Sequence, residues 1–120
     1  MEAMELGQRA VKCKHWRWMA GMLSAQLQLV CVGVSQDGYP LFPIRSRGTY
    51  PTEHRQSTPD LRYSATLGCL MVMLREAYGD NLVITQGSDW WSVETDDRCW
   101  DCDNTGSLVE ALVLALEAAP

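Results

Sequence analysis

The strongest apolar periodicity in the chain runs from residue 64 to residue 78. Its large apolar side chains recur at the i, i+3, i+4 and i+7 spacing of one helical face: Leu67, Leu70, Met71, Leu74 and Tyr78. Cys69, Val72 and Met73 make the other side apolar too, so we expect a central helix that its neighbours cover on most of its circumference. Gly79 follows, and it favours the left-handed backbone that ends many helices.

A second helix is predicted at about residues 107–118. Ser107 and Glu110 fit the capping box Ser-x-x-Glu, in which the serine side chain accepts a hydrogen bond from the first helical turn. The apolar stripe of this helix consists of Leu108, Leu112, Ala115, Leu116 and Ala119. A short helix is also predicted over residues 4–13.

Apolar and polar residues alternate in several short segments, as they do in half-buried strands. Asp37 and Gly38 form an Asp-Gly pair, the strongest short-range signal of a hairpin turn. Pro40 and Pro43 confine the segment after this turn to the edge of a sheet. The predicted strands are residues 15–19, 26–34, 39–44, 82–85, 90–95 and 98–102.

The order of these elements predicts an α+β fold, in which helices pack on one face of a small antiparallel β-sheet. A length of 120 residues is typical of one domain, so we expect a single domain over residues 1–120. Residues 45–63 have no clear periodicity and are predicted to form a long polar loop. Loops of this length tend to be functional or disordered.

Composition and charge indicate the setting. No apolar run reaches the length of a membrane span, and the acidic residues 1–5 do not resemble a secretory signal. We therefore expect a cytoplasmic protein with no membrane partner, no disulfide framework and no cofactor. Residues 9–62 carry eight basic and three acidic side chains, whereas residues 63–120 carry two basic and ten acidic ones. The overall charge of −5 argues against general nucleic-acid binding and leaves room for a local anion site.

Parts of both ends and of the central helix resemble a known protein family. The matching stretches are Lys14–Met22, Pro59–Leu61, Ala65–Leu70, Leu74–Gly79 and Glu110–Ala118. They are similar to a family of small uncharacterised accessory proteins of tailed bacteriophages, prophages and related mobile elements. The resemblance implies an accessory protein that acts in a bacterial cell, and it supplies no catalytic or binding residues.

Tryptophan is unusually frequent, with five Trp against one Phe. Alternation sends Trp90 and Trp91 to opposite faces of a sheet, so we expect at least one tryptophan of this region to emerge at the surface. An exposed tryptophan on a strand indicates an interface, and a homodimer is the default assembly. The residues predicted to form the interface are Trp16, Trp18, Trp90, Trp91 and Trp100.

The polar loop is a candidate ligand site. Guanidinium groups bind phosphate and carboxylate in a bidentate manner, and an aromatic ring can stack on a base. If the loop folds over the sheet, it could therefore hold a nucleotide-like anion between Arg45 and Arg62. The residues predicted to bind this ligand are Arg45, Arg47, Tyr50, His54 and Arg55. The simpler alternative, which we favour, is a solvated loop that binds nothing.

Two clusters suggest a metal ion. Cys99 and Cys102 have the C-x-x-C spacing of zinc ligands, and Cys13 with His15 could supply a second pair. We favour ordinary cysteines over zinc, because a second C-x-x-C is missing from the sequence. A group of acidic residues lacks the glycine and terminal glutamate of a calcium loop, and we expect a solvated turn there: Asp96, Asp97, Asp101 and Asp103.

The sequence contains none of the common catalytic motifs, among them G-x-S-x-G, H-E-x-x-H and the phosphate-binding P-loop. We therefore predict no catalytic residues and no enzyme activity. The favoured function is an accessory protein that binds a host protein without catalysis. The alternatives are a binder of a small nucleotide-like anion and, less favoured, a small zinc-binding protein.

Overall fold

The computed structural model describes residues 2–44, 50–101 and 107–120. Within these ranges the chain forms three α-helices and two three-stranded antiparallel sheets, which confirms the predicted α+β class and divides the strands between two sheets. The elements are, in order, α1 (Ala3–Ala10), β1 (Gly33–Val34), β2 (Pro40–Phe42), β3 (Thr52–Glu53), α2 (Ser64–Tyr78), the 3₁₀ turn η2 (Gly79–Asn81), β4 (Val83–Gln86), β5 (Trp91–Glu94), β6 (Cys99–Asp101) and α3 (Leu108–Glu117).

Both longer helices form where the sequence predicts them. Helix α2 ends at Gly79, whose φ of 66° lies in the left-handed region. Helix α3 begins after Ser107, and the Ser107 Oγ accepts a 3.1 Å hydrogen bond from the Glu110 N–H. The expectation that α2 is covered on most of its circumference is wrong in part. Its buried side includes Leu70, whereas Val72 is 43% exposed.

Two of the predicted strands are wrong in whole or in part. Residues 15–19 form no strand. The Trp16 and Trp18 rings instead pack on each other edge to face, with their centres 5.8 Å apart. Within residues 26–34, only Gly33–Val34 forms a strand. The chain turns instead at Gln28, which has a φ of 53° and whose N–H donates to the Ser24 carbonyl oxygen over 2.9 Å.

The predicted Asp-Gly hairpin is confirmed, because β1 pairs with β2 in an antiparallel manner and Gly38 adopts a φ of 89°. The third strand of this sheet, β3, comes from the segment that the sequence analysis treats as a polar loop. That segment also contains buried polar side chains, Ser57, Thr58 and Asp60. Its described part, residues 50–63, is therefore packed into the fold.

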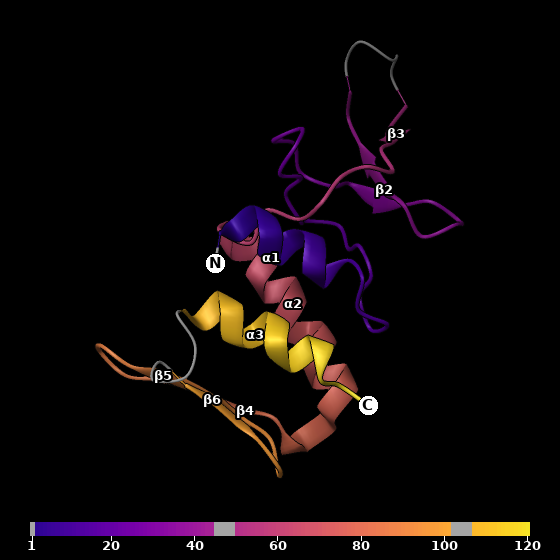
Figure 1. Ribbon diagram of the computed structural model, residues 1–120. Coiled ribbons are helices and arrows are strands. Elements are labelled where there is room, and N and C mark those ends of the chain that lie inside the picture. Colours follow the sequence, from indigo (N-terminus) through magenta and orange to yellow (C-terminus); the bar gives the residue numbers. More distant parts are fainter. Residues whose placement is uncertain (1, 45–49, 102–106) are drawn as a thin grey trace.

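The two sheets lie at opposite ends of the molecule, and the helices lie between them (Figure 1). The molecule measures 47 × 26 × 20 Å and has a radius of gyration of 15.0 Å, against the roughly 13–14 Å of a compact domain of this length. Helix α3 packs against β5 and β6. None of the helices in the described ranges is long and apolar enough to cross a membrane.

Candidate interaction surface

The sheet β4–β5–β6 has one face directed toward α3. Antiparallel pairing places Ile84, Val93 and Trp100 in one row across the three strands. Val93 and Trp100 are buried in the same apolar cluster as the α3 residues Leu112 and Leu116. This row therefore forms the covered face of the sheet.

The opposite face is left uncovered by the described part of the chain. Successive side chains of a strand point to opposite faces, so Val83 and Thr85 of β4 and Ser92 and Glu94 of β5 share this second face. Val83 is 51% exposed, and Thr85 and Glu94 are exposed as well. We call this surface, together with Trp90, the open face.

Trp90 stands at the end of the open face, in the turn between β4 and β5. The Gly87 N–H donates a 2.7 Å hydrogen bond to the Trp90 carbonyl oxygen, which continues the pairing of the two strands into the turn. A Cβ atom at Gly87 would overlap the Trp90 indole, so the indole lies directly over this glycine. It is nevertheless 47% exposed. A large ring is thus positioned by the backbone and presented to solvent.

The region around the open face is strongly acidic. Residues 80–101 contain one basic side chain, Arg98, whose guanidinium lies over the Trp100 ring at 5.0 Å. The same range contains six acidic residues: Asp80, Asp89, Glu94, Asp96, Asp97 and Asp101. Ion pairs of the described residues join Arg9 to Glu117, Arg17 to Glu76, Arg55 to Glu53 and Arg62 to Asp60. The acidic excess of the chain is therefore concentrated at this end of the molecule.

The five tryptophans predicted to form an interface have different environments. Trp90 is exposed, and Trp16 and Trp91 are half-buried. Trp18 and Trp100 are buried at 8% and 5% exposure, so the prediction that these two side chains offer a surface to a partner is wrong. Trp18 instead packs edge to face on Phe42 at 6.1 Å. Alternation correctly separated neighbouring tryptophans, but it could not show which face other elements cover.

A second feature, an aromatic pocket, brings together residues that the sequence predicts in two different sites. The pocket has a volume of about 300 Å³ and is lined by Val11, Trp16, Trp18, Gly38, Tyr39, Arg55 and Ser57. The Arg55 guanidinium lies over the Tyr39 ring at 4.5 Å and is hydrogen-bonded to Glu53. That hydrogen bond is also the main cause that lowers the pKa of Glu53. The guanidinium is therefore already partnered.

Of the other residues predicted to bind an anion, Arg45 and Arg47 lie outside the described residues, and Tyr50 is 84% exposed. The His54 Nδ1 and the Ser57 Oγ are 2.6 Å apart, and the Ser57 Oγ is 2.8 Å from the Ser24 Oγ. A serine beside a histidine has the chemical identity of a nucleophile and its base. Here Ser57 is 5% exposed and its hydroxyl is bonded on two sides, so it joins the segment of His54 and Ser57 to that of Ser24.

Of the two cysteines in the C-x-x-C pair, the structure describes only the first. Cys99 is exposed on the open side of β6, whereas Cys102 and Asp103 lie outside the described residues. Desolvation, followed by the charges of Glu94 and Asp101, raises the pKa of the Cys99 thiol and so disfavours the thiolate that zinc requires. Within the described ranges, no three His, Cys, Asp or Glu side chains form a group that could hold a metal ion. Zinc binding at Cys99 and Cys102 remains the less favoured alternative, and it falls partly outside the described residues.

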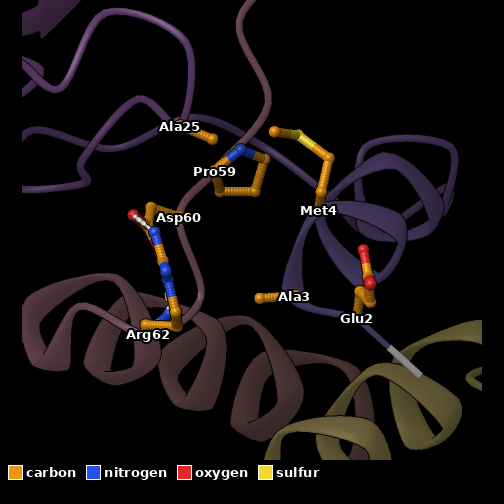
Figure 2. Close-up of a pocket in the computed structure, with 7 residues that line it drawn as sticks. All are labelled: Glu2, Ala3, Met4, Ala25, Pro59, Asp60 and Arg62. Carbon is orange, nitrogen blue, oxygen red and sulfur yellow. Dashed lines mark hydrogen bonds and ion pairs between the residues drawn. The ribbon is translucent and has the colours of Figure 1, made fainter.

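A hollow of about 350 Å³ between the start of α1 and residues 59–62 was not predicted from the sequence. Figure 2 shows Asp60 and Arg62 on one side of it, and Ala3, Met4 and Glu2 on the other. Two nitrogens of the Arg62 guanidinium donate to the Asp60 carboxylate, both over 3.0 Å. The hydrogen bond from Arg62 is the main cause that lowers the pKa of Asp60 to about 2. Because its cation and anion satisfy each other, we assign no ligand to this hollow.

Comparisons of the chain with protein-family models, with curated proteins and with solved structures gave no match.

Proposed function

We propose that the protein is an accessory protein of a phage or mobile element that acts in the bacterial cytoplasm by binding a host protein, without catalysis. The observation that carries this proposal is Trp90, a large ring that lies against the backbone of Gly87 at the end of a sheet face left uncovered by the described residues. Tryptophan is enriched among the few residues that supply most of the energy of protein interfaces. The resemblance to small phage proteins supplies the cellular setting.

The open face suits a protein partner better than it suits a small molecule. It is a sheet surface that carries exposed side chains from two strands and a turn, including Val83, Thr85 and Trp90. Small ligands prefer concave sites that bury most of their surface, whereas protein interfaces combine an aromatic anchor with a polar rim. The acidic residues at the ends of β4 and β5 provide such a rim.

Capture of a nucleotide-like anion is less favoured. In the described part of the predicted loop, Arg55 pairs with Glu53 and Arg62 pairs with Asp60. An anionic ligand would have to displace these carboxylates from the arginines. A homodimer through the open face is also less favoured, because a twofold axis would set one acidic surface against its identical copy.

The experiment compares the wild type with Trp90→Ala and with Val72→Ala, which truncates an exposed apolar side chain on α2. Each purified protein is immobilised and incubated with bacterial host lysate, and retained proteins are quantified by mass spectrometry. The retained host protein is then purified and titrated by calorimetry. We expect wild type and Val72→Ala to bind it equally, and Trp90→Ala to bind at least about tenfold more weakly, as at an interface hot spot.

Equal binding by Trp90→Ala and the wild type would show that the open face is not the binding surface. Circular dichroism of each variant confirms that the fold is retained. The proposal also fails if calorimetry with the purified host protein detects no binding to the wild type.

A further inference from the structure

We infer that the segment that docks on the open face is basic, rich in lysine and arginine, and that one of its cations lies against the Trp90 indole. This inference rests on the proposed function and names the chemistry of the partner. It is carried by two observations, the position of the uncompensated acidic residues around the open face and the exposure of the indole among them.

The acidic residues lie at both ends of the open face as well as on it. Asp89 precedes Trp90 in the β4–β5 turn, Glu94 lies on the face, and Asp96 with Asp97 forms the β5–β6 turn. At roughly 3.3 Å per residue, the seven steps from Asp89 to Asp96 cover roughly 20 Å. A partner segment of about seven extended residues, or a helix of about 14 residues, would therefore reach both turns.

Among the described residues, no ion pair joins a cation of the chain to Asp89, Glu94, Asp96 or Asp97. Arg98 lines a surface hollow together with these last three residues, but its guanidinium lies over the ring of Trp100, which belongs to the covered row. Arg9, Arg17 and Arg62 pair with carboxylates outside residues 80–101. A partner's lysines and arginines would thus meet Asp89, Glu94, Asp96 and Asp97 without displacing a cation of the described residues from an ion pair.

Trp90 adds a specific contact for a cation. Of the aromatic side chains, tryptophan attracts an ammonium or guanidinium group most strongly over the face of its ring. The five-membered ring of the indole lies against Gly87, which lacks a side chain, and Trp90 remains 47% exposed. The same negative field repels nucleic acid, anionic lipid and a second copy of the open face.

The test uses two synthetic peptides of about 14 residues, one built from lysine, arginine and alanine, and one with every basic residue replaced by glutamate. Each is titrated into the ¹⁵N-labelled full chain, and amide and indole N–H shifts are followed by NMR. We expect the basic peptide to shift signals of β4, β5 and the Trp90 indole. Its affinity should fall at least about tenfold between about 50 mM and about 300 mM salt, because the Debye length shortens by roughly half. The acidic peptide should cause no shifts.

Variants locate the binding on the molecule. Asp96→Lys reverses a charge in the β5–β6 turn and should weaken binding several-fold. Asp37→Lys makes the same change in the β1–β2 turn at the other end of the molecule and should leave binding unchanged. Gly87→Ala should displace the indole and weaken binding, while it retains every charge.

The inference is overturned if the basic peptide causes no shifts at low salt, if its shifts lie outside the open face, or if Asp37→Lys weakens binding as much as Asp96→Lys does. The proposed function still holds in these cases if a host protein binds and Trp90→Ala weakens that binding. The docking segment of the host protein would then not be basic. Conversely, Trp90-independent capture of the host protein overturns the proposed function even if the basic peptide binds the open face.

Discussion

At Gly7 of α1 a neighbouring segment leaves no room for a side chain, whereas at Gly68 of α2 there is room for one. A Cβ atom at position 7 would lie 2.6 Å from the Pro59 carbonyl oxygen, and that oxygen belongs to the backbone and cannot rotate away. Gly7→Ala should therefore push α1 from the 59–62 segment. We expect a net loss of about 1–2 kcal/mol in the free energy of unfolding, since overpacking outweighs the gain in helix propensity. Urea denaturation measures the change.

Gly68→Ala is the matched control for this prediction. Nothing lies within 4 Å of a Cβ at position 68, and the residue is exposed in the middle of α2. Alanine should stabilise the protein here by about 0.5–1 kcal/mol, because glycine loses more backbone entropy in a helix. If both substitutions stabilise the protein, α1 is not packed as tightly against Pro59 as the structure has it.

Asp60 makes stability depend on pH in the acid range. Its pKa is lowered from 3.8 to about 2, mainly by the hydrogen bond from Arg62 and, among further causes, by hydrogen bonds from the Arg62 backbone and from Gln28. A carboxylate whose folded pKa is depressed contributes its full stabilisation above its unfolded pKa and loses it as pH falls through the folded pKa. We expect up to about 2 kcal/mol to be lost between about pH 5 and pH 2.

Urea denaturation at several pH values tests this expectation in the wild type, Asp60→Asn and Arg62→Gln. The asparagine variant should be less stable at pH 7 and should lose less stability on acidification. Arg62→Gln should reduce the slope as well, because it removes the main cause of the shift. A wild-type slope that equals that of Asp60→Asn between pH 5 and pH 2 would contradict the assignment to Asp60.

At the scale of elements, local signals predicted those parts of the fold in which local physics decides the structure. The apolar period and Gly79 gave α2 its bounds, the capping box gave the start of α3, and Asp37-Gly38 gave the first hairpin. The failures lie where tertiary contacts decide. The sequence Trp16-Arg17-Trp18 alternates like a strand, but its two indoles pack on each other. The turn at Gln28 combines local hydrogen bonds with one from the Gln28 side chain to Asp60, 32 residues away.

The caps of α2 and α3 differ in a way that predicts opposite effects of substitution. Ser107→Ala removes the Oγ that accepts from the Glu110 N–H, and it should cost about 1 kcal/mol. Tyr63, the residue before α2, has extended backbone and makes no such hydrogen bond. Tyr63→Asp should therefore add a cap and stabilise the chain by about 0.5–1 kcal/mol. Thermal unfolding followed by circular dichroism measures both changes. If Ser107→Ala is as stable as the wild type, the cap is not needed for α3.

At the scale of the whole molecule, the sequence predicted the ingredients of the open face but not its location. It identified a surplus of tryptophan, the opposite orientation of Trp90 and Trp91, and an acidic second half. Which tryptophan is exposed depends on where α3 packs, and a contact between elements far apart in the chain leaves no local pattern. The burial of Ser57 and Asp60 was missed for the same reason, since polar residues usually indicate solvent.

The elongated shape predicts that the two ends of the molecule differ in local stability. Helix α3 contributes five buried residues to the apolar cluster, whereas the sheet β1–β2–β3 contributes the large side chain of Phe42 and leaves Val32 and Val34 exposed. Regions with few buried apolar contacts open at lower free energy than the core does. Hydrogen exchange should therefore show β1–β3 opening at least about 2 kcal/mol more easily than α3.

Two amides measure the opening of the first sheet. The Val32 N–H donates to the Leu41 carbonyl oxygen over 2.9 Å, and the His54 N–H donates to the Pro40 carbonyl oxygen over 3.1 Å. Amides of the buried α3 residues Ala115 and Leu116 report on the core. Phe42→Ala should remove most of the protection at the first sheet and reduce that of α3 less, because its ring packs on Trp18 and His54. All these amides could instead share one free energy of opening, which Phe42→Ala lowers equally at every amide. In that case the chain opens as a single cooperative unit despite its elongated shape. The open face would then be as rigid as the core, and partner binding could not draw on local unfolding at the opposite sheet.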